Sequence, residues 1–171
     1  MKPDLAPLSP DAGTVRIRIV QSRDLLEILA INKKSFVLPY GASVFQEFFR
    51  EHRETFLVAE LGDRVVGYSM SRLMRRISFR GLGMKRMGHI MSIAIHPEYR
   101  RKGIGRNLLA QTLENLSDHG AEEARLEVRV SNRLAIAMYE SFGFEREKVL
   151  DGYYSDGEDA ILMVKCLEDG R

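Results

Sequence analysis

Apolar and polar residues recur along the chain with two different periods, which together outline a series of strands and helices. Residues 15–20 alternate apolar with basic side chains and predict a half-exposed strand, whereas 90–95 is an apolar, largely β-branched run typical of a buried strand. The spacing of apolar residues over 22–36, 43–52 and 104–116 favours helices. The same patterns predict further strands at 55–61, 64–75, 125–130, 148–153 and 160–167, and one short helix over 132–143.

Local signals indicate where several of these elements begin or turn. Ser22 is expected to cap the first helix, and Ser43 with Gln46 has capping-box spacing at the second. Gly62-Asp63 has the chemistry of a two-residue hairpin turn, and Asn132 is expected to cap the short helix. The order of elements predicts an α/β fold in which helices cover a mixed sheet.

The composition is that of a globular protein. With 171 residues, 44% of them hydrophobic and 29% charged, the chain suggests one domain over 15–167 with tails at 1–14 and 168–171. A net charge of +2 is too small to indicate a nucleic-acid-binding protein. The single cysteine, Cys166, excludes an internal disulfide, favours the reducing cytoplasm and is expected to fill a small buried space. No apolar run approaches the roughly 18 residues of a transmembrane helix, so no membrane contact is expected.

Residues 72–86 form a basic stretch without acidic residues, which predicts a loop after the second hairpin strand. A solvated loop and a contact to RNA or the ribosome both fit this composition. Its basic residues are Arg72, Arg75, Arg76, Arg80, Lys85 and Arg86.

The most informative stretch joins the buried strand to the helix that follows it. Residues 100–106 read Arg-Arg-Lys-Gly-Ile-Gly-Arg. A helix start carries unpaired N–H donors and a positive dipole end, and Gly103 and Gly105 would let a phosphate come close. The glycine spacing fits neither a Rossmann fingerprint nor a P-loop. A solvated basic turn is the alternative, but the agreement of strand, turn and helix favours a pyrophosphate site.

Two pairs of polar residues are candidates for catalysis. Asn132 and Tyr139 are seven residues apart on one helix face, where a tyrosine hydroxyl could protonate a thiolate and the amide could bind a ligand. A helix cap with a core tyrosine is the alternative. His89 and Glu127 are polar residues in neighbouring strands and could act as a base through a shared water. The alternative for His89 is a bond to a backbone carbonyl, and the remaining histidines lack metal-ligand spacing, so no metal is expected.

The residues before the last strand form an acidic segment next to two tyrosines. Asp156, Glu158 and Asp159 do not match an EF-hand and predict either a charged turn or a contact to a cationic amine. Tyr153 and Tyr154 could hydrogen-bond a peptide backbone.

Four segments together resemble the GCN5-related N-acetyltransferase (GNAT) superfamily, and most closely its protein N-terminal acetyltransferase branch of archaeal enzymes, the NatA catalytic subunit and RimI. They are 88–95, 100–105, 129–133 and 153–160, and the resemblance extends over residues 15–166. It implies a single mixed, mostly antiparallel sheet of about seven strands with a parallel splayed pair, covered by about four helices. It also implies direct transfer of acetyl from acetyl-CoA, without a metal, to the free N-terminus of a protein or peptide in a ternary complex.

The resemblance also implies roles for individual residues. Tyr139 would protonate the CoA thiolate, and His89 and Glu127 match positions linked to base catalysis in relatives. Tyr153 and Tyr154 would hold the peptide backbone. Acetyl-CoA would be bound by Ser92, Ile93, Ala94, Ile95, Arg100, Arg101, Lys102, Gly103, Ile104, Gly105, Arg106, Asn132, Ala135 and Tyr139.

The segment between the first two helices departs from the family pattern. Relatives often have Leu-Pro-Glu there, whereas this chain has Leu38, Pro39 and Tyr40, expected to contact the substrate. The missing glutamate leaves the base and the preferred first residue open. Two rival functions stay open: an acetyltransferase for lysine side chains or small amines, and a ribosome- or RNA-binding module that retains the fold. An auxiliary subunit is a further expected partner.

Overall fold

The structure, a computed structural model, describes residues 14–77 and 84–167, which form seven strands and four α-helices. Within this described part, no helix is long and apolar enough to cross a membrane. The elements are β1 (Val15–Ile19), α1 (Leu25–Ser35), α2 (Ala42–Glu51), β2 (Phe56–Leu61), β3 (Arg64–Ile77), β4 (Met84–Ile95), α3 (Ile104–Asp118), β5 (Glu123–Arg129), α4 (Arg133–Ser141), β6 (Glu145–Leu150) and β7 (Ala160–Cys166).

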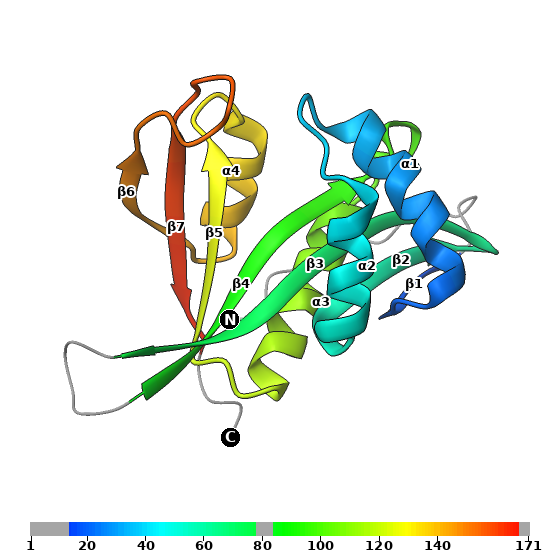
Figure 1. Cartoon of the computed structure of the whole chain (residues 1–171), viewed down its shortest axis with the longest axis horizontal. Helices are drawn as coiled ribbons and strands as arrows, with labels where there is room; N and C mark the ends of the chain where they lie inside the picture. Colours follow the sequence, from blue (N-terminus) through cyan, green and yellow to red (C-terminus); the bar gives the residue numbers. More distant parts are fainter. Residues whose placement is uncertain (1–13, 78–83, 168–171) are drawn as a thin grey trace. The chain divides into compact units, whose positions relative to one another are not determined.

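The strands form one hydrogen-bonded sheet in the order β1-β2-β3-β4-β5-β7-β6 (Figure 1). Strands β4 and β5 pair in parallel, whereas β1–β2, β2–β3, β5–β7 and β6–β7 pair antiparallel. The expected mixed, mostly antiparallel sheet with a parallel pair is therefore confirmed.

The described residues group into two compact units, and each is considered by itself. The first comprises the described residues up to 72 together with 92–115, and so holds β1, β2, α1, α2 and most of α3. The second comprises the described residues of 73–91 and 116–171, and so holds β5, β6, β7 and α4. Strands β3 and β4 each contribute to both units.

An aromatic cluster forms part of the core of the first unit. The Phe45 ring contacts the rings of Tyr68 and Phe56, with centroids 5.6 and 6.4 Å apart. Phe48, one turn further along α2, is also buried. The aromatic spacing along 45–49 therefore reflects core packing, because one side of a short amphipathic helix faces the sheet.

Gly67 determines how closely the end of β4 lies against β3 in the first unit. A Cβ atom at this position would lie 2.4 Å from Cδ1 of Ile95 and 3.0 Å from the Ala94 carbonyl oxygen. A side chain here would displace the Ile95 side chain and crowd the Ala94 carbonyl, so this glycine lets the β4 segment that precedes the glycine-bearing turn sit close to β3.

Helix α4 and the strands around β7 form the core of the second unit. Figure 1 shows β7 between β5 and β6. Leu126 and Met163 are buried and face each other across the β5–β7 register. Ile136 of α4 and Phe144 are buried as well.

Several local predictions were wrong. The first helical segment begins with a capping box made by Gln21 and Asp24 rather than by Ser22, and Gly41 rather than Ser43 is the N-cap of α2. The stretch 72–86 is not a loop at either end, because residues up to 77 belong to β3 and those from 84 belong to β4. Arg80 of that stretch, residues 1–13 of the predicted tail 1–14 and the predicted tail 168–171 lie outside the described residues. Cys166 is exposed rather than buried.

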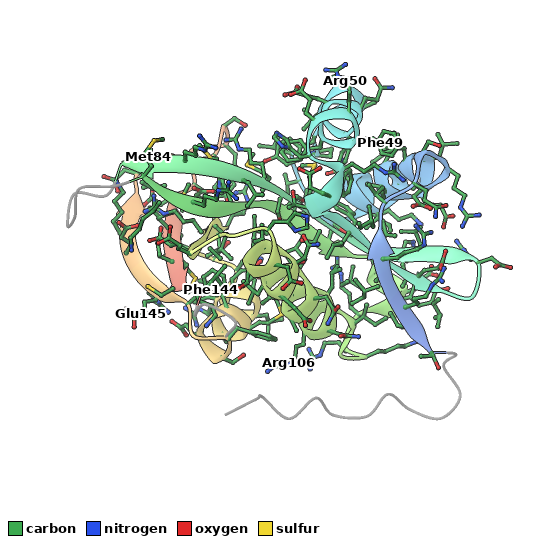
Figure 2. The ribbon with its side chains drawn as sticks, turned by 90° about the horizontal axis from the view of Figure 1, so that it is seen from below. Phe49, Arg50, Met84, Arg106, Phe144 and Glu145 are labelled. Carbon is green, nitrogen blue, oxygen red and sulfur yellow. The ribbon has the colours of Figure 1, made fainter. Side chains whose placement is uncertain are left out.

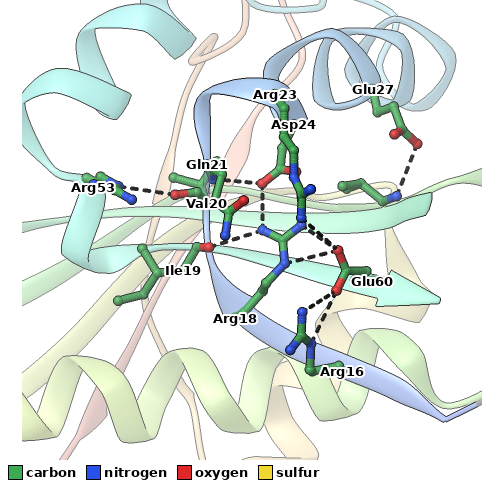
Figure 3. Close-up of polar contacts among 11 residues, drawn as sticks. Arg16, Arg18, Ile19, Val20, Gln21, Arg23, Asp24, Glu27, Arg53 and Glu60 are labelled. Atoms are coloured by element: carbon green, nitrogen blue, oxygen red, sulfur yellow. Dashed lines mark hydrogen bonds and ion pairs between the residues drawn. The ribbon is translucent and has the colours of Figure 1, made fainter. Parts of the chain in front are cut away.

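A cluster of charged side chains connects β1 to β2 and to the turn before α1 (Figure 3). Arg18 donates from Nη1 to Asp24 at 2.7 Å and from Nη2 to Glu60 at 2.6 Å, and only 12% of its side chain is exposed. Arg16 reaches the other oxygen of Glu60 at 2.7 Å, but its side chain is 67% exposed. Alternation along 15–20 predicted that both arginines face solvent, which is wrong for Arg18.

The two arginines hold the carboxylates of this cluster in the ionised form. Hydrogen bonds from Arg18 and then Arg16 lower the pKa of Glu60 from 4.5 to about 2. Burial alone would raise the pKa of Asp24, but hydrogen bonds from Arg18 and the Gln21 backbone outweigh it, and the pKa is lowered.

Replacing Arg18 with methionine should therefore destabilise the fold by about 3–5 kcal/mol at pH 7, because the buried carboxylates of Asp24 and Glu60 both lose their most buried cationic partner. Arg16→Met is the matched control and should cost less than about 1 kcal/mol, since the Arg16 side chain is exposed and Glu60 keeps its hydrogen bond to Arg18. A carboxylate whose pKa is lower in the folded than in the unfolded state stabilises the fold at pH values above its unfolded pKa. This contribution is lost as the pH falls toward the folded pKa. The stability gap between Arg18→Met and the wild type should therefore narrow between about pH 4.5 and pH 2. Denaturant unfolding measures both effects, and equal losses for the two variants would contradict this assignment.

Candidate functional site

The glycine-bearing turn leads from β4 to α3 in the first unit, as the sequence predicted. A short 3-10 helix at Pro97–Tyr99 follows β4, and α3 begins at Ile104. Arg101 and Gly103 have positive φ angles of 64° and 79°, and among the described non-glycine residues Arg101 alone does so. These left-handed positions redirect the backbone into the first turn of α3, whose N–H groups have no partner within the helix. The strand, turn and helix start are as predicted, and the use of this turn as an anion site stays a prediction.

The cationic side chains of this turn differ in what they contact. Arg100 donates from Nε to the Ile95 carbonyl at 3.0 Å and from Nη2 to Ser35 Oγ at 3.1 Å, so it links the turn to β4 and α1. The Lys102 ammonium lies 5.4 Å from the centre of the Tyr99 ring. Arg106 lies on the first turn of α3 (Figure 2). Arg100 therefore has a structural contact, and its expected contribution to anion binding stays a prediction.

The end of β4, residues 92–95, precedes this turn. Ser92 is buried, and its Oγ lies 3.0 Å from the Tyr68 hydroxyl. Ala94 is buried, whereas Ile93 and Ile95 are half-buried. The expected use of backbone groups of Ile93 and Ile95 by a ligand stays a prediction.

His89 and Glu127 form a direct hydrogen bond in the second unit. His89 Nε2 lies 2.7 Å from Glu127 Oε2, and their side chains are 13% and 18% exposed. The parallel register pairs His89 with Arg125, so Glu127 lies two residues further along β5, on the same face. The partner of His89 Nε2 is thus the Glu127 carboxylate, in direct contact rather than through the shared water that was expected. A carboxylate paired with an imidazole can accept a proton and share it between the two groups.

Asn132 caps α4, as predicted. Its Oδ1 accepts a hydrogen bond from the Ala135 backbone at 3.3 Å. This contact accounts for the carboxamide oxygen and leaves the carboxamide nitrogen as the part of Asn132 suited to a ligand. Ala135 is in the first turn of α4, where its N–H completes the cap.

Tyr139 lies two turns along α4 and is buried. Its ring packs edge-on against Phe144, with centroids 5.7 Å apart. Burial, with a smaller effect from Tyr154, raises the pKa of the Tyr139 hydroxyl above its usual range. The hydroxyl therefore stays protonated at neutral and moderately alkaline pH and can serve as a hydrogen-bond or proton donor there.

The acidic segment before β7 is held by contacts within the second unit. Arg129 stacks on Tyr154, with its guanidinium carbon 4.0 Å from the ring centre, and donates to Glu158 at 2.5 Å. Glu158 also accepts hydrogen bonds from the backbone and hydroxyl of Ser131. Asp156 pairs with Arg129, and Asp159 accepts from the Gly152 backbone. The charged-turn prediction is confirmed, because these acids hold the loop in shape. Tyr153 packs edge-on against Tyr154 and is largely exposed.

The segment that contains Leu38, Pro39 and Tyr40 joins α1 to α2 in the first unit. Leu38 and Tyr40 are exposed. The Tyr40 ring packs edge-on against Phe45 at 6.4 Å, and its carbonyl accepts a hydrogen bond from Asn32 Nδ2 at 2.9 Å. Asn32 lies within 22–36, where the apolar stripe that predicted a helix includes its position, and the sequence pattern did not reveal this contact. A lone carboxamide within such a stripe is the signal that could have revealed it.

The structure thus brings the predicted residues together in groups. In the first unit, the glycine-bearing turn follows directly on the end of β4. In the second unit, His89 pairs with Glu127, Asn132 with Ala135, and Tyr139 packs against Phe144. Among the described residues there is no group of three or more His, Cys, Asp or Glu side chains arranged to hold a metal ion.

The protein has a mixed sheet in which a glycine-bearing turn leads from a strand into a helix. This architecture agrees with that of the acetyltransferase superfamily that the sequence resembles. The model of the acetyltransferase (GNAT) family matches residues 23–144, and the chain belongs to this family. The protein is therefore a GNAT acetyltransferase.

Individual relatives narrow the comparison. The chain is 43% identical over 154 residues to the N-alpha-acetyltransferase of Saccharolobus solfataricus. The alignment covers 88% of this chain and 92% of the relative. The crystal structure of Chaetomium thermophilum Naa20 with a bisubstrate analogue is similar, with a TM-score of 0.78 and 30% identity over 91% of this chain and 88% of that one. Arabidopsis thaliana Naa50 with the bisubstrate analogue CoA-Ac-MVNAL has a TM-score of 0.74 and 26% identity, covering 88% of this chain and 97% of that one.

Proposed function

We propose that this protein transfers an acetyl group from acetyl-CoA to the free N-terminal α-amine of a protein or peptide. The observation that carries the proposal is the 43% identity to an N-alpha-acetyltransferase over 88% of the chain. Direct attack by the amine is favoured because the sequence has no nucleophile elbow or Cys/His pairing that would indicate a covalent intermediate.

The first unit suits the polyphosphate end of acetyl-CoA. The left-handed backbone at Arg101 and Gly103, the absence of a side chain at Gly105, and the N–H groups of the first α3 turn fit a pyrophosphate. Arg101, Lys102 and Arg106 supply compensating charge, and backbone groups of residues 92–95 would hold the pantetheine arm. When bound, acetyl-CoA supplies an activated thioester.

The second unit supplies the proposed proton transfers. Tyr139 protonates the departing thiolate, because its hydroxyl carries a proton across the working pH range; the raised pKa also makes it a weaker acid, so its contribution depends on its position. The His89–Glu127 pair takes a proton from the substrate ammonium, directly or through water. A weak base suffices because an α-amine has a pKa of about 7.7–8.0, whereas a lysine amine near 10.4 is far less often neutral. Asn132 would bind the pantetheine amide.

Tyr153 and Tyr154 are the proposed contacts to the peptide backbone. Because Glu158 and Asp156 bond to Arg129, they position Tyr154 through its stacking on Arg129 and are themselves committed within the loop. A contact to backbone rather than to side chain would accept many first residues, and selection would then fall to residues 38–40.

Paired peptides test this function. One peptide carries a free N-terminus and the other the same sequence with a blocked N-terminus, each containing a lysine. CoA release should occur with the free peptide only. Release with both peptides would support the lysine alternative, and salt-dependent RNA binding without turnover would support the RNA-binding alternative.

The base assignment predicts a pH-dependent defect. His89→Gln and Glu127→Gln should each lower kcat/KM about 10-fold or more at pH 7. The loss should shrink toward pH 9, because the amine is then already neutral without help from the protein. Glu123→Gln, which removes a carboxylate from the same strand, is the matched control and should leave the profile unchanged. Wild-type pH–rate profiles for both test variants would remove the pair from the base role.

Two kinds of partner extend the proposal. Exposed Leu26 of α1 and Val37 after it offer apolar surface for an auxiliary subunit. Arg75 and Lys85, on the β3 and β4 ends of the basic stretch, offer charge for a ribosome contact. A single cysteine favours action in the reducing cytoplasm.

A further inference from the structure

Three buried polar side chains form a chain of hydrogen bonds through the first unit. Asn32 comes from α1, Tyr68 from β3 and Ser92 from β4, and all three are buried. The Tyr68 hydroxyl lies 3.0 Å from Ser92 Oγ and 3.4 Å from Asn32 Oδ1, and Asn32 Nδ2 donates to the Tyr40 carbonyl at 2.9 Å. The chain thus extends from the end of β4 to the segment that joins α1 to α2.

The donors and acceptors of this chain permit one consistent arrangement. The Tyr40 carbonyl can only accept, so the Asn32 amide nitrogen must face it and the Asn32 oxygen must face Tyr68. Tyr68 then gives its one proton to Asn32, and Ser92 donates to the Tyr68 oxygen. Each of these buried polar side-chain atoms therefore has a defined donor or acceptor role.

Asn32 contacts the joining segment, residues 36–41, near both ends. Its backbone carbonyl accepts from Phe36 N at 3.2 Å, and its side chain reaches the Tyr40 carbonyl. Between these two contacts the segment has no regular secondary structure, and the Val37 side chain is 82% exposed. Packing alone therefore gives residues 37 and 38 little support, and Asn32 supplies a fixed point on either side of them.

We propose that Asn32 is a positioning residue that holds segment 36–41 in place and, through Tyr68 and Ser92, ties it to the end of β4. This inference rests on the proposed function, in which residues 38–40 read the first residue of the substrate and residues 92–95 hold the acetyl donor. Asn32 touches neither substrate. It sets selectivity by fixing the backbone of Tyr40 relative to the β4 end within the same unit.

The test uses Asn32→Leu, which keeps the volume but removes both side-chain hydrogen bonds. Hydrogen exchange should become faster over 36–41 and stay unchanged over β5–β7. For peptides that differ in the first residue, kcat/KM should fall about 5–30-fold for the preferred ones, the equivalent of one lost hydrogen bond, so that the ranking flattens. The Kd of acetyl-CoA should change less than about twofold, because that site retains all its groups. Ile28→Leu, a buried change on the same helix without polar loss, should alter none of these quantities.

Two further measurements keep the test decisive. If Asn32→Leu fails to fold, Asn32→Asp replaces it, because it keeps the shape and the acceptor for Tyr68 but loses the N–H donor to Tyr40. Tyr68→Phe leaves the Asn32–Tyr40 bond intact and should show a smaller change in exchange. Unchanged exchange over 36–41 with an unchanged peptide ranking would overturn the inference. Absence of α-amine acetylation by the wild type would instead overturn the proposed function, whereas faster local exchange in Asn32→Leu would still support the positioning role.

Discussion

We expect kcat to fall about 100-fold or more when Tyr139 is replaced by phenylalanine, in line with the usual contribution of a general acid. The ring is buried and packs edge-on against Phe144, so phenylalanine retains the packing and removes only the hydroxyl. Burial raises the pKa of this hydroxyl, so the wild-type group stays protonated as pH rises from 7 to 9. The defect should therefore be similar across that range, unlike the defect expected for the His89–Glu127 pair.

Steady-state kinetics with a peptide substrate measures this effect, and two controls accompany it. The Kd of acetyl-CoA and the midpoint of thermal unfolding should both stay near their wild-type values, which excludes a loss of binding or of fold. A wild-type kcat in Tyr139→Phe would show that the hydroxyl serves only the core.

The second large effect is expected at the start of α3. Gly105→Glu should weaken acetyl-CoA binding about 10–100-fold, because bulk and negative charge enter the proposed pyrophosphate site and hydrogen bonds to a charged group are lost. The fold should survive, because a glutamate in the first turn of a helix interacts favourably with the helix dipole. Gly105 is better suited to this test than Gly103, whose φ of 79° would strain any other residue.

Calorimetric titration with acetyl-CoA gives the affinity directly. Gln46→Glu on α2 is the matched control, because it adds the same single charge at an exposed helical position of the same unit. It should leave the Kd within about twofold. Unchanged affinity in a folded Gly105→Glu variant would mean that the turn is not the pyrophosphate site.

The strands and helices followed from the sequence where apolar periodicity was strong. The run from Ile90 to Ile95 and the glycines at 62 and 103 gave a strand, a hairpin turn and a helix start that the structure contains. Helix caps were less predictable, because several polar residues stand near each helix start and geometry selects one. The N-cap residues in the structure are Gln21 and Gly41 rather than the predicted Ser22 and Ser43.

Contacts between residues far apart in sequence could be predicted only in part. His89 and Glu127 were identified as polar residues in neighbouring strands, but their direct bond depends on the β4–β5 register, which the sequence pattern does not encode. Arg18 alternated like an exposed residue, yet Glu60 on β2 and Asp24 draw it inward. Asn32 looked like an imperfection in an apolar stripe, because its partners Tyr68 and Tyr40 lie 36 and 8 residues away.

The position of the transferred acetyl group tests the central claim most directly. A peptide with a free N-terminus and an internal lysine would be incubated with the protein and acetyl-CoA, and fragment-ion mass spectrometry would locate the added mass. The proposed function predicts acetyl on the α-nitrogen of the first residue, with the lysine unmodified. Acetyl on the lysine ε-nitrogen with a free N-terminus would contradict it.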